Sequence, residues 1–316
     1  MMKRLIILTG PTASGKSGLS LRLAKELGCE IVSADSMQVY KHMDIGTAKI
    51  SAGEMQGIPH HLIDVLEPTE EYNVTRFKDE AELALKDIYD RGRLPLIVGG
   101  TGFYIQALLY DIDFSDTAQT PYRESLFKEA REKGSLCLYE KLKECDPDAA
   151  VYIHANDVKR ITRALEYYHE TGKKISEHNR EERRRTSPYD FRYFVLNKPR
   201  EILYKDIDDR VDEMIKRGLV DEVKRLKDLG CKADMVSMYG LGYKEILKYL
   251  DGAISLDEAV YIIKRDTRHF AKRQITWFKR ERDVIWINKD EFNYDDDKII
   301  DFMLEKINNG RVTEEV

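Results

Sequence analysis

Short apolar runs alternate along the chain with longer segments in which apolar residues recur every three or four positions. The runs have the length of buried strands and lie at residues 5–8, 30–33, 94–98, 191–196 and 284–287. The periodic segments predict amphipathic helices, first at residues 18–27, 74–91 and 103–109. The pattern therefore predicts an α/β fold in which a parallel sheet carries helices on both faces.

The alternation stops between residues 113 and 189. Polar residues and proline break it first, and three helical segments follow between residues 122 and 169. Residues 173–185 are strongly basic and poor in apolar side chains, which predicts an exposed loop or a frayed helix. We therefore predict a core made of residues 1–112 and 190–316, interrupted by a helical insertion at residues 113–189.

Helices dominate the chain after the insertion. Helical periodicity covers residues 200–218, 219–229 and 256–279, and a glycine-containing turn at 237–245 leads into a further helix. After the last strand, residues 283–316 contain ten acidic and four basic residues, which we interpret as an acidic tail.

A glycine-rich turn joins the first predicted strand to the first predicted helix, with the sequence Gly10-Pro11-Thr12-Ala13-Ser14-Gly15-Lys16-Ser17. This is the G-x-x-x-x-G-K-[ST] pattern of phosphate-binding loops, in its expected context. Its glycines allow successive backbone N–H groups to converge on an anion, and the helix N-terminus adds partial positive charge. Lys16 supplies a full charge, and the Ser17 hydroxyl is suited to ligate Mg²⁺. The sequence therefore predicts a P-loop NTPase-like core that binds phosphate groups.

Two polar side chains follow other predicted strands. Asp35 comes after the strand 30–33, and Thr101 comes after the strand 94–98 and two glycines. Ligands of open α/β sheets bind beyond the carboxyl ends of the strands, so both side chains are expected near the phosphate loop. Each is also suited to cap the segment that follows it, and for Thr101 the two roles are compatible.

Histidines and cysteines do not form a recognisable metal site in the sequence. The adjacent His60 and His61 lie in a predicted short strand at the end of the loop 46–64, where their side chains point to opposite faces. We therefore expect structural histidines. The four cysteines are scattered without C-x-x-C spacing, which favours reduced thiols in a cytoplasmic protein. No apolar run approaches membrane-spanning length, so we expect no membrane association.

The charge distribution suggests a localised polyanion site. The net charge of −5 argues against a protein that coats nucleic acid indiscriminately, yet residues 264–282 contain eight basic and two acidic residues. In the helix 256–279, a basic face lies opposite an apolar stripe and includes Lys264, Arg265, Arg268, Lys272 and Lys279. Contact with a phosphate backbone is the favoured interpretation, and a solvated face is the alternative.

Taken together, these segments resemble the tRNA dimethylallyltransferase (isopentenyltransferase) family. Besides the phosphate loop, the matching motifs are Asp35-Ser36-x-Gln38-x-Tyr40, Asp44-Ile45-Gly46-Thr47-Ala48-Lys49, Gly99-Gly100-Thr101, Asn156-Asp157-x-x-Arg160 and Ala271-Lys272-Arg273-Gln274-Ile275-Thr276-Trp277. They extend over most of the chain, and the last one is specific. Ser17 replaces the threonine of many relatives but keeps the hydroxyl. Tyr239 and Gly240 replace the Arg and Cys of others, which leaves their role in base reading open.

The resemblance implies transfer of a dimethylallyl group from dimethylallyl diphosphate to N6 of the adenosine just 3′ of the anticodon. Residues 10–17 and Mg²⁺ would hold the diphosphate, Asp35 would accept the proton from the amine, and Thr101 would hydrogen-bond at the reacting centre. The implied tRNA contacts are Asp35, Ser36, Met37, Gln38, Thr101, Arg123, Lys159, Arg160, Ile161, Thr162, Arg163, Arg268, Lys272, Arg273 and Gln274. The partner would be the anticodon stem-loop, and we expect a monomer.

Two other functions remain alternatives. A small-molecule P-loop kinase is supported by the phosphate loop alone, and the basic insertion would then act as a phosphate-clamping lid. A nucleotide-dependent RNA-binding module without chemistry is the other, although the placement of Asp35 and Thr101 argues against it. The sequence also leaves open whether a nucleotide competes at the phosphate loop.

Overall fold

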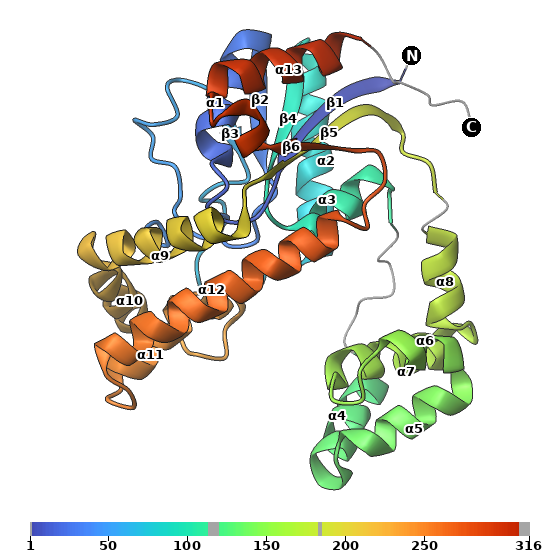
Figure 1. Cartoon of the computed structure of the whole chain (residues 1–316). Helices are drawn as coiled ribbons and strands as arrows, with labels where there is room; N and C mark the ends of the chain where they lie inside the picture. The colour runs from blue at the N-terminus through green and yellow to red at the C-terminus, as the bar shows by residue number, and fades with distance from the viewer. Residues whose placement is uncertain (1, 113–119, 183–184, 310–316) are drawn as a thin grey trace. The chain divides into compact units, whose positions relative to one another are not determined.

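The computed structural model describes residues 2–112, 120–182 and 185–309, and it forms two compact units (Figure 1). Unit 1 consists of Met1–Leu109 and Pro188–Val316, and unit 2 consists of Tyr110–Ser187. Three parts of the sequence predictions lie outside the described residues: the predicted start of the insertion at 113, residues 183–184 of the basic segment, and residues 310–316 of the acidic tail.

Unit 1 is built on a six-stranded parallel sheet in the order β3-β2-β4-β1-β5-β6. The strands are β1 (Lys3–Thr9), β2 (Cys29–Ser33), β3 (His60–His61), β4 (Leu94–Gly99), β5 (Tyr189–Asn197) and β6 (Val284–Asn288). The predicted α/β fold with a parallel sheet is thus confirmed. β1 lies in the centre, so the phosphate loop that follows it emerges at the middle of one sheet edge.

Helices cover both faces of this sheet (Figure 1). The connection from β1 through α1 (Lys16–Leu27) runs one way along the sheet, and the connection from β3 through α2 (Val74–Asp90) runs back to β4. Because such crossovers are right-handed, α1 and α2 lie on opposite faces. α3 (Gly102–Leu109) packs beside α2, and α13 (Asp296–Asn308) packs beside α1.

The prediction of an acidic tail after the last strand was wrong for its larger part. After a 3₁₀ turn, η2 (Lys289–Phe292), the chain forms α13, whose apolar residues join α1 in the core cluster: Ile299, Ile300, Met303 and Ile307. The acids begin the helix, because the Asp295 carboxylate accepts the N–H groups of Asp297 and Lys298.

A group of helices follows β5: α9 (Arg200–Lys216), α10 (Leu219–Asp228), the 3₁₀ turn η1 (Val236–Tyr239), α11 (Tyr243–Leu250) and α12 (Leu256–Phe278). In Figure 1, α12 runs alongside α9. Leu203 and Ile207 of α9 pack against Ala271 of α12, and Ala13 of the phosphate loop packs against this cluster. The two helices therefore border the phosphate site.

Unit 2 is helical, and its helices are α4 (Pro121–Lys133), α5 (Ser135–Cys145), α6 (Pro147–Tyr152), α7 (Val158–Thr171) and α8 (Ile175–Glu182). It has its own core, in which Leu138 and Leu142 of α5 meet Ile161 and Leu165 of α7. α8 occupies the segment predicted as a loop or a frayed helix. The short α6 was not predicted; the Asp146 carboxylate caps it by accepting the N–H of Ala149 at 3.0 Å. Among the described helices of both units, none combines the length and apolar character needed to cross a bilayer.

Candidate active site

The phosphate loop adopts the conformation that its glycines predict. Gly10 and Gly15 have φ values of 151° and 92°. A side chain at Gly10 would also meet the Leu196 carbonyl oxygen of β5 at 2.6 Å, so the close approach of two strands requires glycine there. Gly15 provides no side-chain cap for α1, which leaves the first N–H groups of the helix available to an anion.

Two cations from different elements converge near this loop. Lys16 donates to the carbonyl oxygens of Gly10 at 3.0 Å and Pro11 at 2.8 Å. Burial and the nearby Arg210 guanidinium lower the pKa of Lys16 to about 7, although the Asp35 carboxylate acts in the opposite direction. Burial also lowers the pKa of Arg210, but an arginine stays charged. The site is thus electropositive and lacks a full set of counter-charges, as expected for the receptor of a multivalent anion.

Arg210 was missed by the sequence analysis. It lies in the middle of α9, more than a hundred residues from Lys16, Asp35 and Thr101, and no motif marks it. The periodicity of α9 predicts only a helix, so the side to which Arg210 points depends on how α9 packs against α12.

Asp35 and Thr101 come together at the carboxyl ends of β2 and β4, as predicted. Asp35 Oδ1 accepts the N–H of Met37 at 2.9 Å and that of Gln38 at 3.4 Å. Thr101 Oγ1 accepts the N–H of Ser36 at 3.2 Å. Among the described residues, no hydrogen bond reaches Asp35 Oδ2, so this oxygen remains available to a substrate. The Thr101 hydroxyl hydrogen remains available to a neighbouring acceptor.

These residues line one pocket of about 330 Å³ in unit 1. Of the predicted site residues, the pocket wall contains Thr12, Asp35, Ser36, Met37, Thr101, Arg273 and Gln274. Its other walls come from α9, α12 and the turn before α11: Ile207, Arg210, Val211, Met214, Tyr239, Gly240, Leu241, Ile263, Thr267 and Phe270. Polar groups come from the ends of the strands and from both helices, and α9 and α12 also add aliphatic and aromatic surface. The pocket is thus suited to a ligand with an anionic part, a polar part and a small apolar part.

One further wall depends on a buried glutamate that the sequence analysis also missed. Glu222 of α10 is 2 % exposed and accepts the backbone N–H groups of Asp44, Ile45 and Gly46 at 2.9, 2.7 and 3.1 Å. The hydroxyl of Tyr243 also donates to it. Glu222 therefore fixes the loop that places Gly46 and Thr47 against the pocket.

A divalent metal fits this site only through a sparse set of protein ligands. No group of three or more His, Cys, Asp or Glu side chains suited to a metal occurs within the described ranges. The exposed Ser17 hydroxyl in the first turn of α1 is the type of oxygen that Mg²⁺ takes together with water and substrate phosphates. His60 bonds the Ile58 carbonyl and His61 bonds Glu30, so both histidines have partners within the protein.

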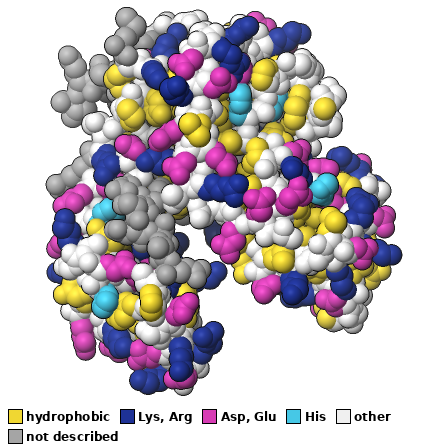
Figure 2. Space-filling model, turned by 180° about the vertical axis from the view of Figure 1, so that it is seen from behind, with side chains coloured by type: hydrophobic (Ala, Val, Ile, Leu, Met, Phe, Trp, Pro, Cys, Tyr) yellow, Lys and Arg dark blue, Asp and Glu magenta, His cyan; other side chains and the backbone are white. Residues whose placement is uncertain are grey.

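The basic face predicted for α12 is partly neutralised by a neighbouring helix. Arg268 pairs with Asp208, and Lys264 pairs with Asp212 at 2.7 Å; both acids belong to α9. Lys272 and Arg273 are exposed. Two of the five basic residues named for this face thus have acidic partners on another helix. Figure 2 shows the opposite side of the molecule from Figure 1, where Lys and Arg are interspersed with Asp and Glu.

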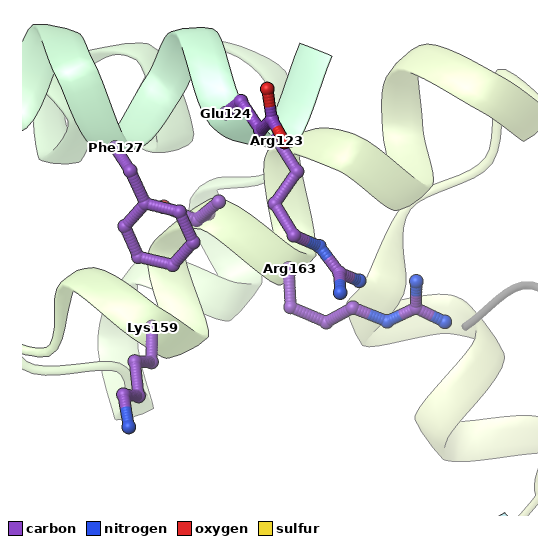
Figure 3. Close-up of a pocket in the computed structure, with 6 residues that line it drawn as sticks. Arg123, Glu124, Phe127, Lys159 and Arg163 are labelled. Atoms are coloured by element: carbon purple, nitrogen blue, oxygen red, sulfur yellow. The ribbon is translucent and has the colours of Figure 1, made fainter. Parts of the chain in front are cut away.

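Unit 2 has a pocket of about 450 Å³ lined by Arg123, Glu124, Phe127, Lys159, Thr162 and Arg163 (Figure 3). Fully buried Glu166 organises it: Arg123 Nε donates to this carboxylate at 2.9 Å and Arg163 Nη1 at 3.2 Å. Burial alone would raise the pKa of Glu166, but the hydrogen bonds from Arg123 and Thr120 outweigh it and lower the pKa. The glutamate thus stays charged and holds two guanidinium groups at the pocket.

Four predicted tRNA contacts gain little support from the structure. Ile161 is fully buried in the core of unit 2, and Thr162 is 1 % exposed, so neither side chain reaches a macromolecule. Gln274 is 7 % exposed, with both polar atoms hydrogen-bonded within the protein. Gln38 directs its amide nitrogen to the carbonyl oxygens of Thr47 and Ala48 at 3.3 and 3.5 Å.

Two family models match the chain. The model described as IPP transferase matches residues 38–281, and the model described as isopentenyl transferase matches residues 3–68. The chain is 59 % identical over 295 residues to a tRNA dimethylallyltransferase of Lachnoclostridium phytofermentans, covering 93 % of this chain and 94 % of the relative. It is 50 % identical over 289 residues to that of Carboxydothermus hydrogenoformans, covering 91 % and 93 %.

Solved structures agree with the sequence matches. The tRNA isopentenylpyrophosphate transferase of Bacillus halodurans is similar at a TM-score of 0.73 and 42 % identity, covering 97 % of each chain. A eukaryotic dimethylallyltransferase described as acting on tRNA is similar at 0.84 and 32 % identity, covering 99 % of this chain and 81 % of that one. The phosphate loop, the paired Asp35 and Thr101, and these matches over nearly the whole length lead to one conclusion: the chain belongs to the tRNA dimethylallyltransferase family.

Proposed function

We propose that this protein transfers a dimethylallyl group from dimethylallyl diphosphate to N6 of the adenosine on the 3′ side of the anticodon in tRNA. The observation that carries the proposal is that a pocket containing Asp35, Thr101 and Arg210 adjoins the phosphate loop, whose Lys16 interacts electrostatically with Arg210 and Asp35. The phosphate loop binds the leaving group, and Asp35 with Thr101 faces the nucleophile. The reaction forms the bond between N6 and C1 of the prenyl group and breaks the C1–O bond, whose electron pair leaves with the diphosphate.

On the nucleophile side, the exocyclic amine is weak because its lone pair is delocalised into the adenine ring. Its proton becomes acidic only as the new bond to carbon forms, and Asp35 Oδ2 is the free oxygen that accepts it. The Met37 and Gln38 N–H groups hold the other oxygen and so fix the direction of the carboxylate. A positioned base of this kind contributes about 10²- to 10⁴-fold to the rate.

On the leaving-group side, the N-terminus of α1, Lys16 and Arg210 stabilise the charge that develops on the diphosphate. Mg²⁺, held by the Ser17 hydroxyl, would neutralise part of the same charge when bound. The apolar surface from Ile207, Val211 and Phe270 gives the prenyl chain a place away from water.

The target adenosine must leave its stack to enter the pocket, so the anticodon stem-loop has to be gripped on either side of it. We expect Arg123 and Arg163, held by Glu166, to bind backbone phosphates, and Phe127 beside them is suited to stack on an unpaired base. Lys159, Arg160, Lys272 and Arg273 are exposed and add charge. We expect a monomer that acts in the cytoplasm, where its tRNA substrate is made.

A transfer assay tests the proposal. The protein is incubated with bulk tRNA, ATP labelled at the γ-phosphate and dimethylallyl diphosphate labelled in the prenyl group. We expect the prenyl label, and not the phosphate label, to become acid-precipitable with the tRNA, and nuclease digestion to place it on an adenosine. Transfer of the phosphate label to a small molecule would support a kinase instead. If neither label were transferred, the protein would be an RNA-binding module without chemistry.

The exposed end of α12 provides a prediction on tRNA binding. We expect Lys272→Ala to weaken tRNA binding and to reduce the slope of log Kd against log salt concentration by about 0.7 to 0.9, as for one lost phosphate contact. Arg268→Ala should change this slope less, because Asp208 already offsets its charge. Filter binding across a salt series measures both effects.

Lys25→Ala is the matched control, since Lys25 is exposed in the last turn of α1. It removes the same charge at the end of that helix away from the phosphate loop. An unchanged slope in Lys272→Ala would assign the basic face of α12 to solvent and leave unit 2 as the main tRNA-binding surface.

A further inference from the structure

Gln274 of α12 lies between the two loops on which the reaction depends. Its Oε1 accepts the N–H of Thr12 in the phosphate loop at 2.9 Å, and its Nε2 donates to the Gly100 carbonyl oxygen at 2.9 Å. The residue is 7 % exposed. The two bonds also determine the orientation of the amide, because Thr12 offers a donor and Gly100 an acceptor.

The position of this bridge along the sheet is informative. β1 and β4 are paired up to Thr9 and Gly99, where the Thr9 hydroxyl also donates to the Gly99 carbonyl oxygen at 2.7 Å. The register ends at that pair, and β1 continues into the phosphate loop and β4 into the loop that carries Thr101. Past this point, within the described residues, no β1–β4 ladder hydrogen bonds fix the distance between the two loops. The two hydrogen bonds of Gln274 take their place.

The contact is tight enough to constrain the sequence of its partner. A Cβ at Gly100 would lie 2.4 Å from Gln274 Nε2, whereas the next neighbours, Gln274 Cδ and the Gly10 carbonyl oxygen, would both lie at 3.7 Å. Glycine is therefore required at position 100 mainly because any side chain there would clash with the Gln274 amide.

We propose that Gln274 is a positioning residue that sets the distance between the leaving group and the nucleophile by clamping the phosphate loop to the Thr101 loop. The inference rests on the function proposed above, in which Thr12 belongs to the diphosphate site and Thr101 to the adenosine site. Transfer requires the two reacting atoms to be held near 3 Å, and a misplacement of about 1 Å costs on the order of 10²-fold in rate.

The first test compares Gln274→Met and Gln274→Glu with the wild type. Met has a similar shape and makes neither hydrogen bond. We expect the single-turnover rate of prenyl transfer at saturating substrates to fall about tenfold to a hundredfold, with the tRNA Kd changed by less than about twofold. Thr276→Val is the matched control on the same helix, because it removes only the exposed hydrogen bond from Thr276 to the Lys272 carbonyl oxygen.

Gln274→Glu adds a readout that a merely structural role would not produce. The ionised carboxylate still accepts the Thr12 N–H but repels the Gly100 carbonyl oxygen, whereas the protonated acid restores both bonds. Its activity relative to the wild type should therefore rise as the pH falls, and the same ratio for Gln274→Met should stay flat. A flat ratio for Gln274→Glu would contradict the clamp.

A double-mutant cycle tests the contact itself. Gly100→Ala alone should slow transfer by about tenfold or more, and in a Gln274→Ala background the same change should cost less than about twofold, because the clashing amide is gone. Equal costs in both backgrounds would overturn the proposal. So would a normal rate with weakened tRNA binding, which would make Gln274 a tRNA contact. If the wild-type protein transfers no prenyl group, it is the proposed function that fails.

Discussion

Replacing Asp35 by Asn is expected to reduce prenyl transfer by about 10²- to 10⁴-fold while leaving tRNA affinity nearly unchanged. The amide has the shape of the carboxylate, and its oxygen can still accept the N–H groups of Met37 and Gln38. It cannot take up the proton that N6 releases. Single-turnover kinetics with labelled dimethylallyl diphosphate and filter binding of tRNA measure the two quantities separately.

Asp79→Asn provides the control for the loss of one acid, because Asp79 is exposed on α2. Near-normal transfer by Asp35→Asn would remove Asp35 from the role of base. A parallel loss of tRNA affinity would instead indicate that the carboxylate organises the binding surface.

Lys16→Ala should weaken the binding of dimethylallyl diphosphate by about tenfold to a hundredfold, the cost of losing hydrogen bonds from a charged donor. The affinity for tRNA should change little. Isothermal calorimetry with the diphosphate alone and filter binding with tRNA give the two constants. Equal losses in both would contradict the assignment of Lys16 to the diphosphate site.

The low pKa of Lys16 adds a pH dependence to this prediction. In the ligand-free site this pKa is about 7, so the ammonium group is increasingly deprotonated above that pH. A bound diphosphate favours the charged form and raises the pKa, so binding takes up a proton. The wild-type affinity should therefore decrease as the pH rises above about 7, and Lys16→Ala should lose this component. The titration of the diphosphate itself is common to both proteins and cancels in the comparison.

Most of the core fold was predictable because its signals are local. The strands other than β3 and the helices α1, α2 and α3 follow from apolar spacing within about twenty residues. The phosphate loop is predicted by eight consecutive residues, because their glycines and their lysine are typical of a single loop conformation that binds phosphate. Asp35 and Thr101 required one further rule, that the carboxyl ends of parallel strands meet at one edge of the sheet.

The segment that forms α13 was wrongly predicted to be an acidic tail, because its net charge was given more weight than its helical periodicity. Its apolar positions Ile299, Met303 and Ile307 are at helical spacing, and Asp295 to Asp297 are the acids that a helix N-terminus favours. Both signals were in the sequence. The acidic residues of 283–316 suggested a tail, although they begin a helix that covers one face of the sheet.

The remaining site residues depend on which helices pack together. Arg210, Glu222 and Gln274 each lie on an ordinary amphipathic helix, and no local pattern shows that they point into a pocket or onto a loop. Likewise, Arg268 is part of a basic face in the sequence, but the packing of α9 beside α12 gives it Asp208 as a partner.

The sequence by itself thus determined the anion-binding loop, the parallel α/β core and the position of the Asp35 carboxylate at the edge of the sheet, because these follow from short-range geometry and from one rule of sheet topology. The tertiary structure alone decided three further features: the second cation near the phosphate loop, the hydrogen bonds of Gln274 to the two loops, and the ion pairs that neutralise part of the basic face of α12. These are contacts between residues from tens to more than two hundred positions apart. Their formation depends on how the helices pack against one another, which local patterns of polarity do not specify.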